Sequence, residues 1–206
     1  MGSVVWSYAS GCKMAEDKMK AAGQPDTMSG MQGCIFVLGG ARSGKSRFAE
    51  NLFPQWPTPW TYLATCQPHD GEMTARVAHH RARRGAGWHT VEEPLDLPAA
   101  LDGADTSPVL VDCLTLWLTN LMLGEHDIAA ATQALLAALR RRTGPTVLVS
   151  NEVGQGIVPD NALARRFRDE AGWLHQSVAR DVARVVFVAV SYTHLRAHET
   201  LRHRVC

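Results

Sequence analysis

One eight-residue stretch limits what this chain can fold into more than any other feature. It reads Gly39, Gly40, Ala41, Arg42, Ser43, Gly44, Lys45 and Ser46. An apolar run at 34–38 precedes it, and a helix-like segment at 47–53 follows it. Glycines let backbone N–H groups turn inward around phosphate oxygens, and the following helix adds its positive N-terminal end. The stretch therefore predicts a phosphate-binding loop, in which Lys45 neutralises the β and γ phosphates of a nucleotide and the Ser46 hydroxyl binds Mg²⁺.

Short apolar runs alternate with helical patterns along the chain. The runs are 34–38, 60–65, 109–112, 146–150 and 185–190. Each is almost wholly apolar, which indicates strands buried on both faces of a parallel sheet. Asp127 caps a helical pattern that continues to about Arg142, and a longer helix after Pro159 carries an apolar stripe that includes Leu163. We expect an α/β fold of the P-loop nucleoside triphosphate hydrolase type, with a mostly parallel sheet and helices on both faces.

The length of 206 residues fits one domain of ordinary size. We assign residues 33–190 to this domain. Residues 1–32 show no helical or strand periodicity and are interpreted as a disordered extension, and 191–206 as an atypical tail that resembles an out-of-frame translation. The chain is thus expected to contain one folded unit with unrelated segments at both ends.

Composition excludes several classes of function. The formal net charge of +1 lacks the basic excess of a nucleic-acid-binding protein. The five cysteines are scattered and contain no Cys-x-x-Cys, which favours a reducing compartment over a disulfide framework. No apolar run approaches the roughly 18 residues that cross a bilayer. We therefore expect a cytoplasmic protein without membrane insertion and without a nucleic-acid partner.

Two acidic residues follow predicted strands and could assist a nucleotide. Asp112 ends the run at 109–112, where a P-loop protein places the carboxylate that holds Mg²⁺ from the opposite side. The alternative for Asp112 is a helix cap at a strand-to-helix turn. Glu152 follows the run at 146–150, at the sheet edge where ligands bind in such folds. It either assists Mg²⁺ or water placement, or anchors the loop from Gly154 to Pro159.

Five separated blocks carry a family resemblance. They are Leu38-Gly39-Gly40-Ala41-Arg42-Ser43-Gly44-Lys45-Ser46-Arg47, Tyr62-Leu63-Ala64-Thr65, Glu72-Met73-x-x-Arg76-x-x-His79-His80, Asp112-Cys113-Leu114-Thr115 and Asn151-Glu152-Val153-Gly154-x-Gly156-Ile157-Val158-Pro159. Over about 34–190 the chain resembles the bifunctional adenosylcobinamide kinase/adenosylcobinamide-phosphate guanylyltransferase family. The resemblance implies adenosylcobinamide and its phosphate as substrates, GTP or ATP as co-substrate with Mg²⁺, and a homotrimer.

The resemblance also implies a covalent step at His79. In that family one histidine of the His-His pair attacks the α-phosphate of GTP and carries GMP, and an imidazole nitrogen is a suitable nucleophile for this. On a helix, Arg76, His79 and Arg83 would share one face, which would present positive charge to a triphosphate. From the residues alone, two adjacent histidines are more typical of a surface or packing feature. His80 remains a nucleotide-contact or structural candidate.

Further nucleotide contacts are implied by the resemblance. They are Ala64, Thr65, Cys66, His80, Arg81, Ala82, Arg83, Glu92 and Asp112. Cys66 stands where such proteins often have serine, and Glu92 is followed by Glu93, so that either glutamate could take this place. His175 stands where the family commonly has asparagine.

Two other functions remain as alternatives. One is a P-loop kinase of another small alcohol, without a covalent intermediate. The other is a guanine-nucleotide switch, which normally carries an Asn/Thr-Lys-x-Asp base-reading motif that this sequence lacks. Covalent labelling by nucleotide separates the first alternative from the two-step enzyme.

Overall fold

The structure is a computed structural model that describes residues 5–8, 33–67 and 85–189. In this part of the chain, seven strands form one sheet in the order β1-β7-β2-β6-β5-β3-β4. They are β1 Val5–Tyr8, β2 Cys34–Gly39, β3 Trp60–Ala64, β4 Trp88–Glu92, β5 Val109–Asp112, β6 Thr146–Asn151 and β7 Arg184–Val188. All neighbouring strands pair in parallel except β1, which is antiparallel to β7.

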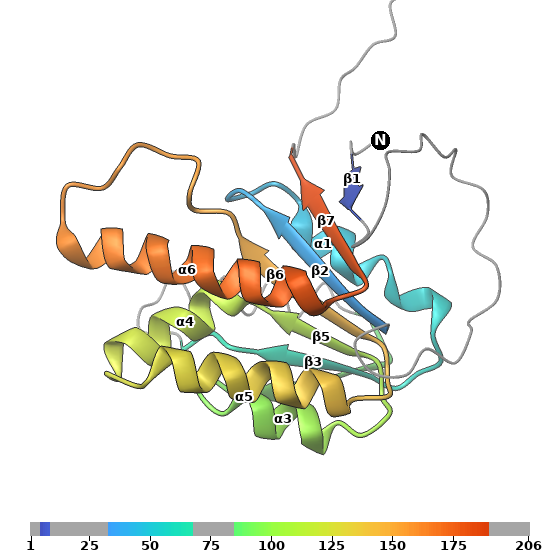
Figure 1. The fold of residues 1–206 in the computed structure, drawn as a ribbon. Helices are drawn as coiled ribbons and strands as arrows, with labels where there is room; N and C mark the ends of the chain where they lie inside the picture. Colours follow the sequence, from blue (N-terminus) through green and yellow to red (C-terminus); the bar gives the residue numbers. More distant parts are fainter. Residues whose placement is uncertain (1–4, 9–32, 68–84, 190–206) are drawn as a thin grey trace, which may run out of the picture.

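Helices cover both faces of the sheet (Figure 1). They are α1 Lys45–Glu50, the 3-10 turn η2 Phe53–Gln55, α3 Leu97–Gly103, α4 Leu114–Leu123, α5 Ile128–Arg141 and α6 Ala162–Asp181. One apolar core joins α3, α4, α5 and α6 to one face, and a second core joins α1 and η2 to the other. The predicted mostly parallel α/β fold with helices on both faces is therefore confirmed.

The five predicted strands are all present, but β1 and β4 were not predicted. β4 mixes polar and apolar residues and is nowhere buried, because it is the outermost strand beside β3. An edge strand lacks the continuous apolar run on which the prediction relied. β1 lies within residues 1–32, which we expected to be an extension without regular structure. Its pairing with β7 corrects that expectation for these four residues. The tail at 191–206 lies outside the described residues.

The two predicted helices are present, and the predicted cap at Asp127 is confirmed. The Asp127 side chain accepts a hydrogen bond from the Ala130 N–H, and the Asn161 side chain caps α6 in the same way through the Ala164 N–H. The apolar stripe of α6 is buried only in its second half, because Leu163 is 58% exposed. The predicted stripe is present, but Leu163 at its start is not part of the core. In the described part of the chain, no helix combines the length and apolarity that a membrane span requires.

Candidate active site

The predicted phosphate-binding loop joins the end of β2 to the start of α1. Two glycines are required by its geometry. A Cβ at Gly39 would lie 2.5 Å from the Ser43 Oγ and 2.6 Å from the Val188 carbonyl oxygen, and no side chain fits there. Gly44 caps α1 with a φ of 86°, a left-handed conformation that favours glycine. The loop therefore turns tightly at the carboxyl edge of the sheet, where ligands bind in open parallel sheets.

The loop encloses its own lysine. The Lys45 ammonium group donates a hydrogen bond to the Gly40 carbonyl oxygen at 3.1 Å, and the residue is only 8% exposed. The Ser43 hydroxyl is buried nearby and has no hydrogen-bond partner among the described residues. Gly40, Ala41 and Arg42 form the outer turn of the loop, where Ala41 and Arg42 are exposed. The positive charge is thus held on the inner side of a loop that carries several polar groups.

Asp112 lies at the carboxyl end of β5, beside this loop. The Tyr62 hydroxyl donates to the Asp112 Oδ2 at 2.9 Å, and no other described side chain is bonded to the second carboxylate oxygen. Ala64 on β3 pairs with Asp112 on one side and with Glu92 on the other, so these three residues are level at the edge of the sheet. α1, which carries the half-buried Ser46, packs against β5. Asp112 does not cap α4, since the N-cap residue of that helix is Cys113.

The donor set fits a magnesium ion. A serine hydroxyl and an aspartate carboxylate are hard oxygen ligands, and Mg²⁺ is commonly bound by one or two such groups together with nucleotide phosphates and water. Within the described residues, no group of three or more His, Cys, Asp or Glu side chains gathers into a metal site. Ser46 and Asp112 could therefore hold Mg²⁺ only with further ligands from the nucleotide and solvent.

The Thr65 side chain serves the fold. Its hydroxyl donates to the Cys113 carbonyl oxygen at 2.8 Å and accepts from the Cys113 N–H at 2.9 Å. Asn120 on α4 donates to the carbonyl oxygens of Thr65 and Pro94. These bonds tie the ends of β3, β4 and β5 together. Thr65 is fully buried, and its N–H, carbonyl oxygen and hydroxyl all have partners within the protein. A nucleotide contact from Thr65 stays a prediction.

The Cys113 thiol at this edge is buried and not activated. Burial, and secondly the Asp112 charge, raise the pKa of the Cys113 thiol to about 11, so it stays protonated near neutral pH. Cys66, a predicted nucleotide contact, follows Thr65 and is half-buried, and Ala64 is buried. The nucleotide contacts of Ala64 and Cys66 stay predictions.

Glu152 follows β6 directly, as predicted. Its N–H donates to the Gly39 carbonyl oxygen at 3.0 Å, which places it next to the phosphate-binding loop. Its carboxylate accepts a hydrogen bond from the Gly154 N–H. The contact present is therefore the one expected for an anchor of the 154–159 loop. A role of Glu152 in placing Mg²⁺ or water stays a prediction.

The structure separates Glu92 from Glu93. The Glu93 carboxylate accepts hydrogen bonds from the N–H groups of Leu95 and Asp96, at 2.9 and 2.7 Å, and so holds the turn before α3. Glu92 is exposed at the end of β4. Of the two glutamates, Glu92 is the one whose position leaves it accessible to a ligand.

The other predicted contacts fall in one segment. His79, His80, Arg81, Ala82 and Arg83 lie outside the described residues. The structure thus brings together the loop at 39–46, Ala64, Thr65, Cys66, Glu92, Asp112 and Glu152, and the histidine chemistry stays a prediction from the resemblance.

Three residues of this edge were given no role from the sequence. Tyr62 holds Asp112, Asn120 ties three strand ends, and the Thr115 hydroxyl accepts from the Asn151 amide at 2.9 Å. Tyr62 and Thr115 belong to the sequence motifs that carry the family resemblance, but these motifs do not show which side chains are in contact. Asn120 had a usable signal, because a polar residue inside the apolar run 114–123 must find buried partners.

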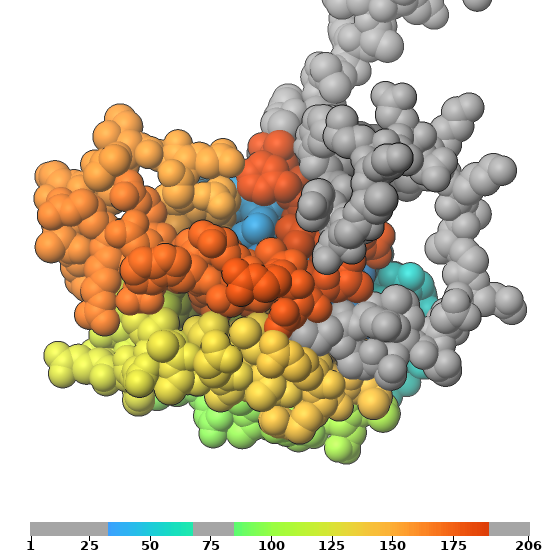
Figure 2. Space-filling view, in the orientation of Figure 1, coloured from blue at the N-terminus to red at the C-terminus, as the bar shows by residue number. Residues whose placement is uncertain are grey.

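These features define a class of protein. A glycine-rich loop follows the central parallel strand β2 and leads into α1, and α1 packs against β5, which is separated from β2 by β6 alone and ends at the Asp112 carboxylate. Figure 2 shows blue atoms of β2 and the following loop exposed between the orange segment before α6 and the red β7. This arrangement is that of a P-loop nucleotide-binding protein.

Comparison with known proteins identifies the family. The family described as "Cobinamide kinase / cobinamide phosphate guanyltransferase" matches residues 35–194. The bifunctional adenosylcobalamin biosynthesis protein CobP of Pseudomonas aeruginosa is 52% identical over 155 residues, which cover 73% of this chain and 90% of that protein. CobU of Salmonella typhimurium, with the same description, is 44% identical over 162 residues, 70% of this chain and 89% of that protein. This chain belongs to the cobinamide kinase / cobinamide phosphate guanyltransferase family, and it is an enzyme.

Among solved structures, an ATPase of a bacterial type III secretion system aligns with a TM-score of 0.43 and 14% identity, covering 71% of this chain and 51% of that chain.

Proposed function

We propose that this enzyme phosphorylates adenosylcobinamide and then transfers GMP from GTP to adenosylcobinamide-phosphate through a GMP–His79 intermediate, which gives adenosylcobinamide-GDP. The observation that carries the proposal is the phosphate-binding loop beside Asp112, in a chain that belongs to the cobinamide kinase family over 35–194. GTP, or ATP for the first step, is the donor, and Mg²⁺ is the metal.

The first step is phosphoryl transfer. The hydroxyl oxygen of adenosylcobinamide forms a bond to the γ-phosphorus of the triphosphate, and the bond from that phosphorus to the β,γ-bridging oxygen breaks. The nucleoside diphosphate leaves, and the hydroxyl proton passes to water. Lys45 and the loop N–H groups hold the phosphates and offset the charge that spreads over their oxygens. Ser46 and Asp112 hold the Mg²⁺, which supplies further charge neutralisation when bound.

The second step is guanylyl transfer in two displacements. A ring nitrogen of His79 forms a bond to the α-phosphorus of GTP, and pyrophosphate leaves. A phosphate oxygen of adenosylcobinamide-phosphate then attacks the same phosphorus, and the phosphorus–nitrogen bond breaks to free the imidazole. A phosphoramidate is reactive enough to pass the nucleotide onward. Glu92, at the open end of β4, is a candidate contact for the guanine nucleotide.

Labelling with GTP tests the covalent step. The protein is incubated with GTP labelled at the α-phosphate and Mg²⁺, and is then denatured. We expect a label that is stable to alkali, lost in acid and absent from His79→Ala. His89→Ala is the matched control, because His89 is an exposed histidine near the amino end of β4, and it should label like the wild type. Full labelling of His79→Ala would contradict the proposed intermediate, and a kinase of another alcohol would give no label at all.

The family resemblance also supports a homotrimer in the cytoplasm. Sedimentation equilibrium should give three times the mass of one chain. A monomer that carries both activities would contradict the trimer.

A further inference from the structure

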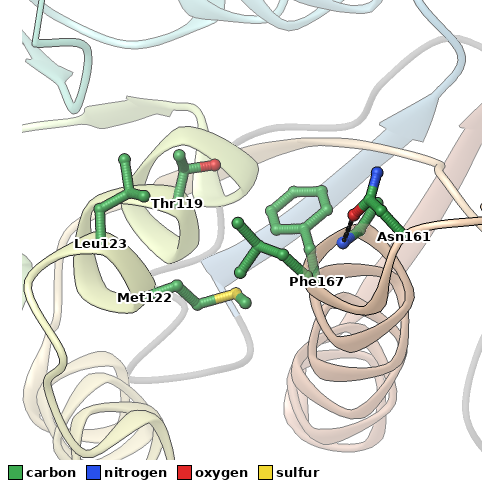
Figure 3. A pocket seen from close by; sticks show the side chains of 7 residues that line it. Thr119, Met122, Leu123, Asn161 and Phe167 are labelled. Carbon is green, nitrogen blue, oxygen red and sulfur yellow. Dashed lines mark hydrogen bonds between the residues drawn. The ribbon is translucent and has the colours of Figure 1, made fainter.

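A cavity between α4 and α6 is not used by the nucleotide site. Its volume is about 330 Å³. Its lining residues are Thr119, Met122, Leu123, Asn161, Leu163, Ala164 and Phe167. Figure 3 shows Met122 and Phe167 extending toward one another from the two helices. None of the lining side chains is charged, so the cavity does not suit a phosphate or a nucleotide.

Exposed apolar side chains gather at this end of the fold. Five large apolar residues are exposed in the part of the chain that the structure describes. Leu123 and Leu163 line the cavity, and they are 64% and 58% exposed. Ile157 and Val158 belong to the loop that leads into α6 and are exposed as well. Apolar surface that gathers around a cavity marks a binding site, because leaving it in water is unfavourable.

The cavity is connected to the nucleotide site through α4. Thr115, in the first turn of this helix, bonds Asn151 at the end of β6, next to the phosphate-binding loop. Thr119 lies one turn further and Leu123 two turns further, about 6 and 12 Å along the helix axis. A ligand in the cavity is therefore within reach of the loop through an arm of about this length.

The polar groups on the cavity wall suit amides. The Thr119 hydroxyl donates to the Thr115 carbonyl oxygen, so its remaining capacity is that of an acceptor. The Asn161 oxygen accepts the Ala164 N–H, which leaves the Asn161 amide group as a donor. The wall thus presents apolar surface with one acceptor and one donor.

We infer that this cavity binds the edge of the corrinoid ring of the acceptor substrate, and so places its hydroxyl arm at the phosphate-binding loop. This inference rests on the proposed function, which supplies the acceptor. A corrinoid carries methyl groups and amide side chains around a flat macrocycle, which matches the apolar and amide-bonding groups of the wall. The volume lies at the lower end of the range for ligand sites, so that it takes part of this large ligand and leaves the rest outside.

Binding of cobinamide to α6 variants tests the inference. Leu163→Gln places a polar amide in the cavity wall near the helix end, where the exposed position tolerates it. Trp173→Gln is the matched control, because Trp173 is 60% exposed on the same helix and does not line the cavity. We expect Leu163→Gln to raise the Kd for cobinamide about tenfold. Trp173→Gln and Leu163→Met should bind as the wild type does, measured by equilibrium dialysis and the visible absorbance of the corrinoid.

Nucleotide affinity separates this effect from misfolding. Leu163→Gln should keep the wild-type Kd for GTP. Equal cobinamide affinity of Leu163→Gln and the wild type, in a protein that still phosphorylates cobinamide, would overturn the cavity assignment alone. Failure of the wild type to bind or phosphorylate cobinamide would overturn the proposed function and this inference with it. A lower sedimentation mass of Leu163→Gln would assign the cavity to a contact between copies, which also overturns the inference.

Discussion

The two edges of the sheet use charged groups in opposite ways. At the amino edge, the Arg142 guanidinium is buried, with the residue only 4% exposed. It donates to the Thr146 hydroxyl at 2.9 Å and to the carbonyl oxygens of Leu101 and Ser107, both at 2.6 Å. All three partners belong to the chain itself, so this charge holds the fold together. Burial lowers the pKa of Arg142, but its basicity keeps it charged.

At the carboxyl edge, the carboxylates are more open among the described residues. Within that part of the chain, Asp112 accepts a hydrogen bond from Tyr62, and Glu92 is exposed. A buried or half-buried charge is normally satisfied by partners. A ligand can act as a partner for these carboxylates. The difference teaches that the same sheet is stabilised at one edge and left open for chemistry at the other.

Lys45→Ala should have the largest effect on activity. We expect turnover in the phosphoryl-transfer step to fall by about a thousandfold or more, because this chemistry depends on electrostatic positioning of the phosphates. Stability should change little, which is measured by urea unfolding. Arg47→Ala, an exposed cation two residues further along α1, is the control and should keep nearly full turnover. Equal turnover of Lys45→Ala and Arg47→Ala would contradict the claim that the charge of Lys45 at the carboxyl edge serves catalysis.

Arg142→Leu should have the largest effect on stability. It leaves the Leu101 and Ser107 carbonyl oxygens buried without their donor, and we expect a loss of about 3 kcal/mol in the free energy of unfolding. Arg141→Leu is the matched control. Its guanidinium pairs with Asp102 in solvent, where such a pair contributes little, so its loss should be clearly smaller. Urea unfolding of both variants measures the two losses in free energy of unfolding. A smaller loss for Arg142→Leu than for Arg141→Leu would contradict the claim that Arg142 stabilises the amino edge of the sheet.

Asp112→Asn should weaken metal binding without unfolding the protein. We expect the Mg²⁺ concentration for half-maximal turnover to rise by about tenfold or more, because a carboxylate ligand is replaced by a neutral amide. Tyr62→Phe keeps the carboxylate and removes only its hydrogen bond. It should change the Mg²⁺ dependence less than Asp112→Asn does, and it should lower the free energy of unfolding by about 1 kcal/mol. A titration of activity with Mg²⁺ measures the first effect. An unchanged Mg²⁺ dependence of activity in Asp112→Asn would contradict the role of Asp112 as a magnesium ligand.

His175→Asn should have the smallest effect of these substitutions, and the effect should be on the pH dependence of stability. The His175 Nε2 lies 2.8 Å from the Ser150 Oγ inside the core, and burial lowers the pKa of the ring below its ordinary value, although the Glu152 charge raises it in part. As pH falls below about 6.5, the unfolded chain binds a proton that the folded chain does not, so the wild type loses stability. Melting temperatures at about pH 7.5 and pH 5.5 should differ less in the variant. An equal difference in both proteins would contradict a neutral buried ring.

Much of the fold followed from residue patterns. The runs at 34–38, 109–112 and 146–150 lie inside the sheet, where burial on both faces demands continuous apolar residues, and all three are strands. β4 escaped prediction, because an outer strand has no such demand. α5 ends at Arg141 with Arg142 as its C-cap, which confirms the predicted end at about Arg142. The burial of the Arg142 side chain was not predicted, because a run of three arginines does not show which of them turns inward. The chain turns after Arg141, and the Arg142 side chain folds inward toward Thr146.

The site was predictable only in part. The loop at 39–46 consists of consecutive residues, so its residue spacing alone is enough to predict its shape. The Tyr62–Asp112 and Thr115–Asn151 pairs join residues that are distant in the sequence, and only the strand order brings them together. Thr65 was expected at the nucleotide because its block resembles the family's, yet its hydroxyl is bonded to Cys113.

A crystal structure of the chain with Mg²⁺ and a GTP analogue that cannot be hydrolysed tests the central claim most directly. The triphosphate should lie in the loop at 39–46 with the Lys45 ammonium on its β and γ phosphates, and the Mg²⁺ should lie between the Ser46 hydroxyl and the Asp112 carboxylate. A triphosphate bound elsewhere, with Lys45 still on the Gly40 carbonyl oxygen, would contradict the claim that the carboxyl edge is the site of the chemistry.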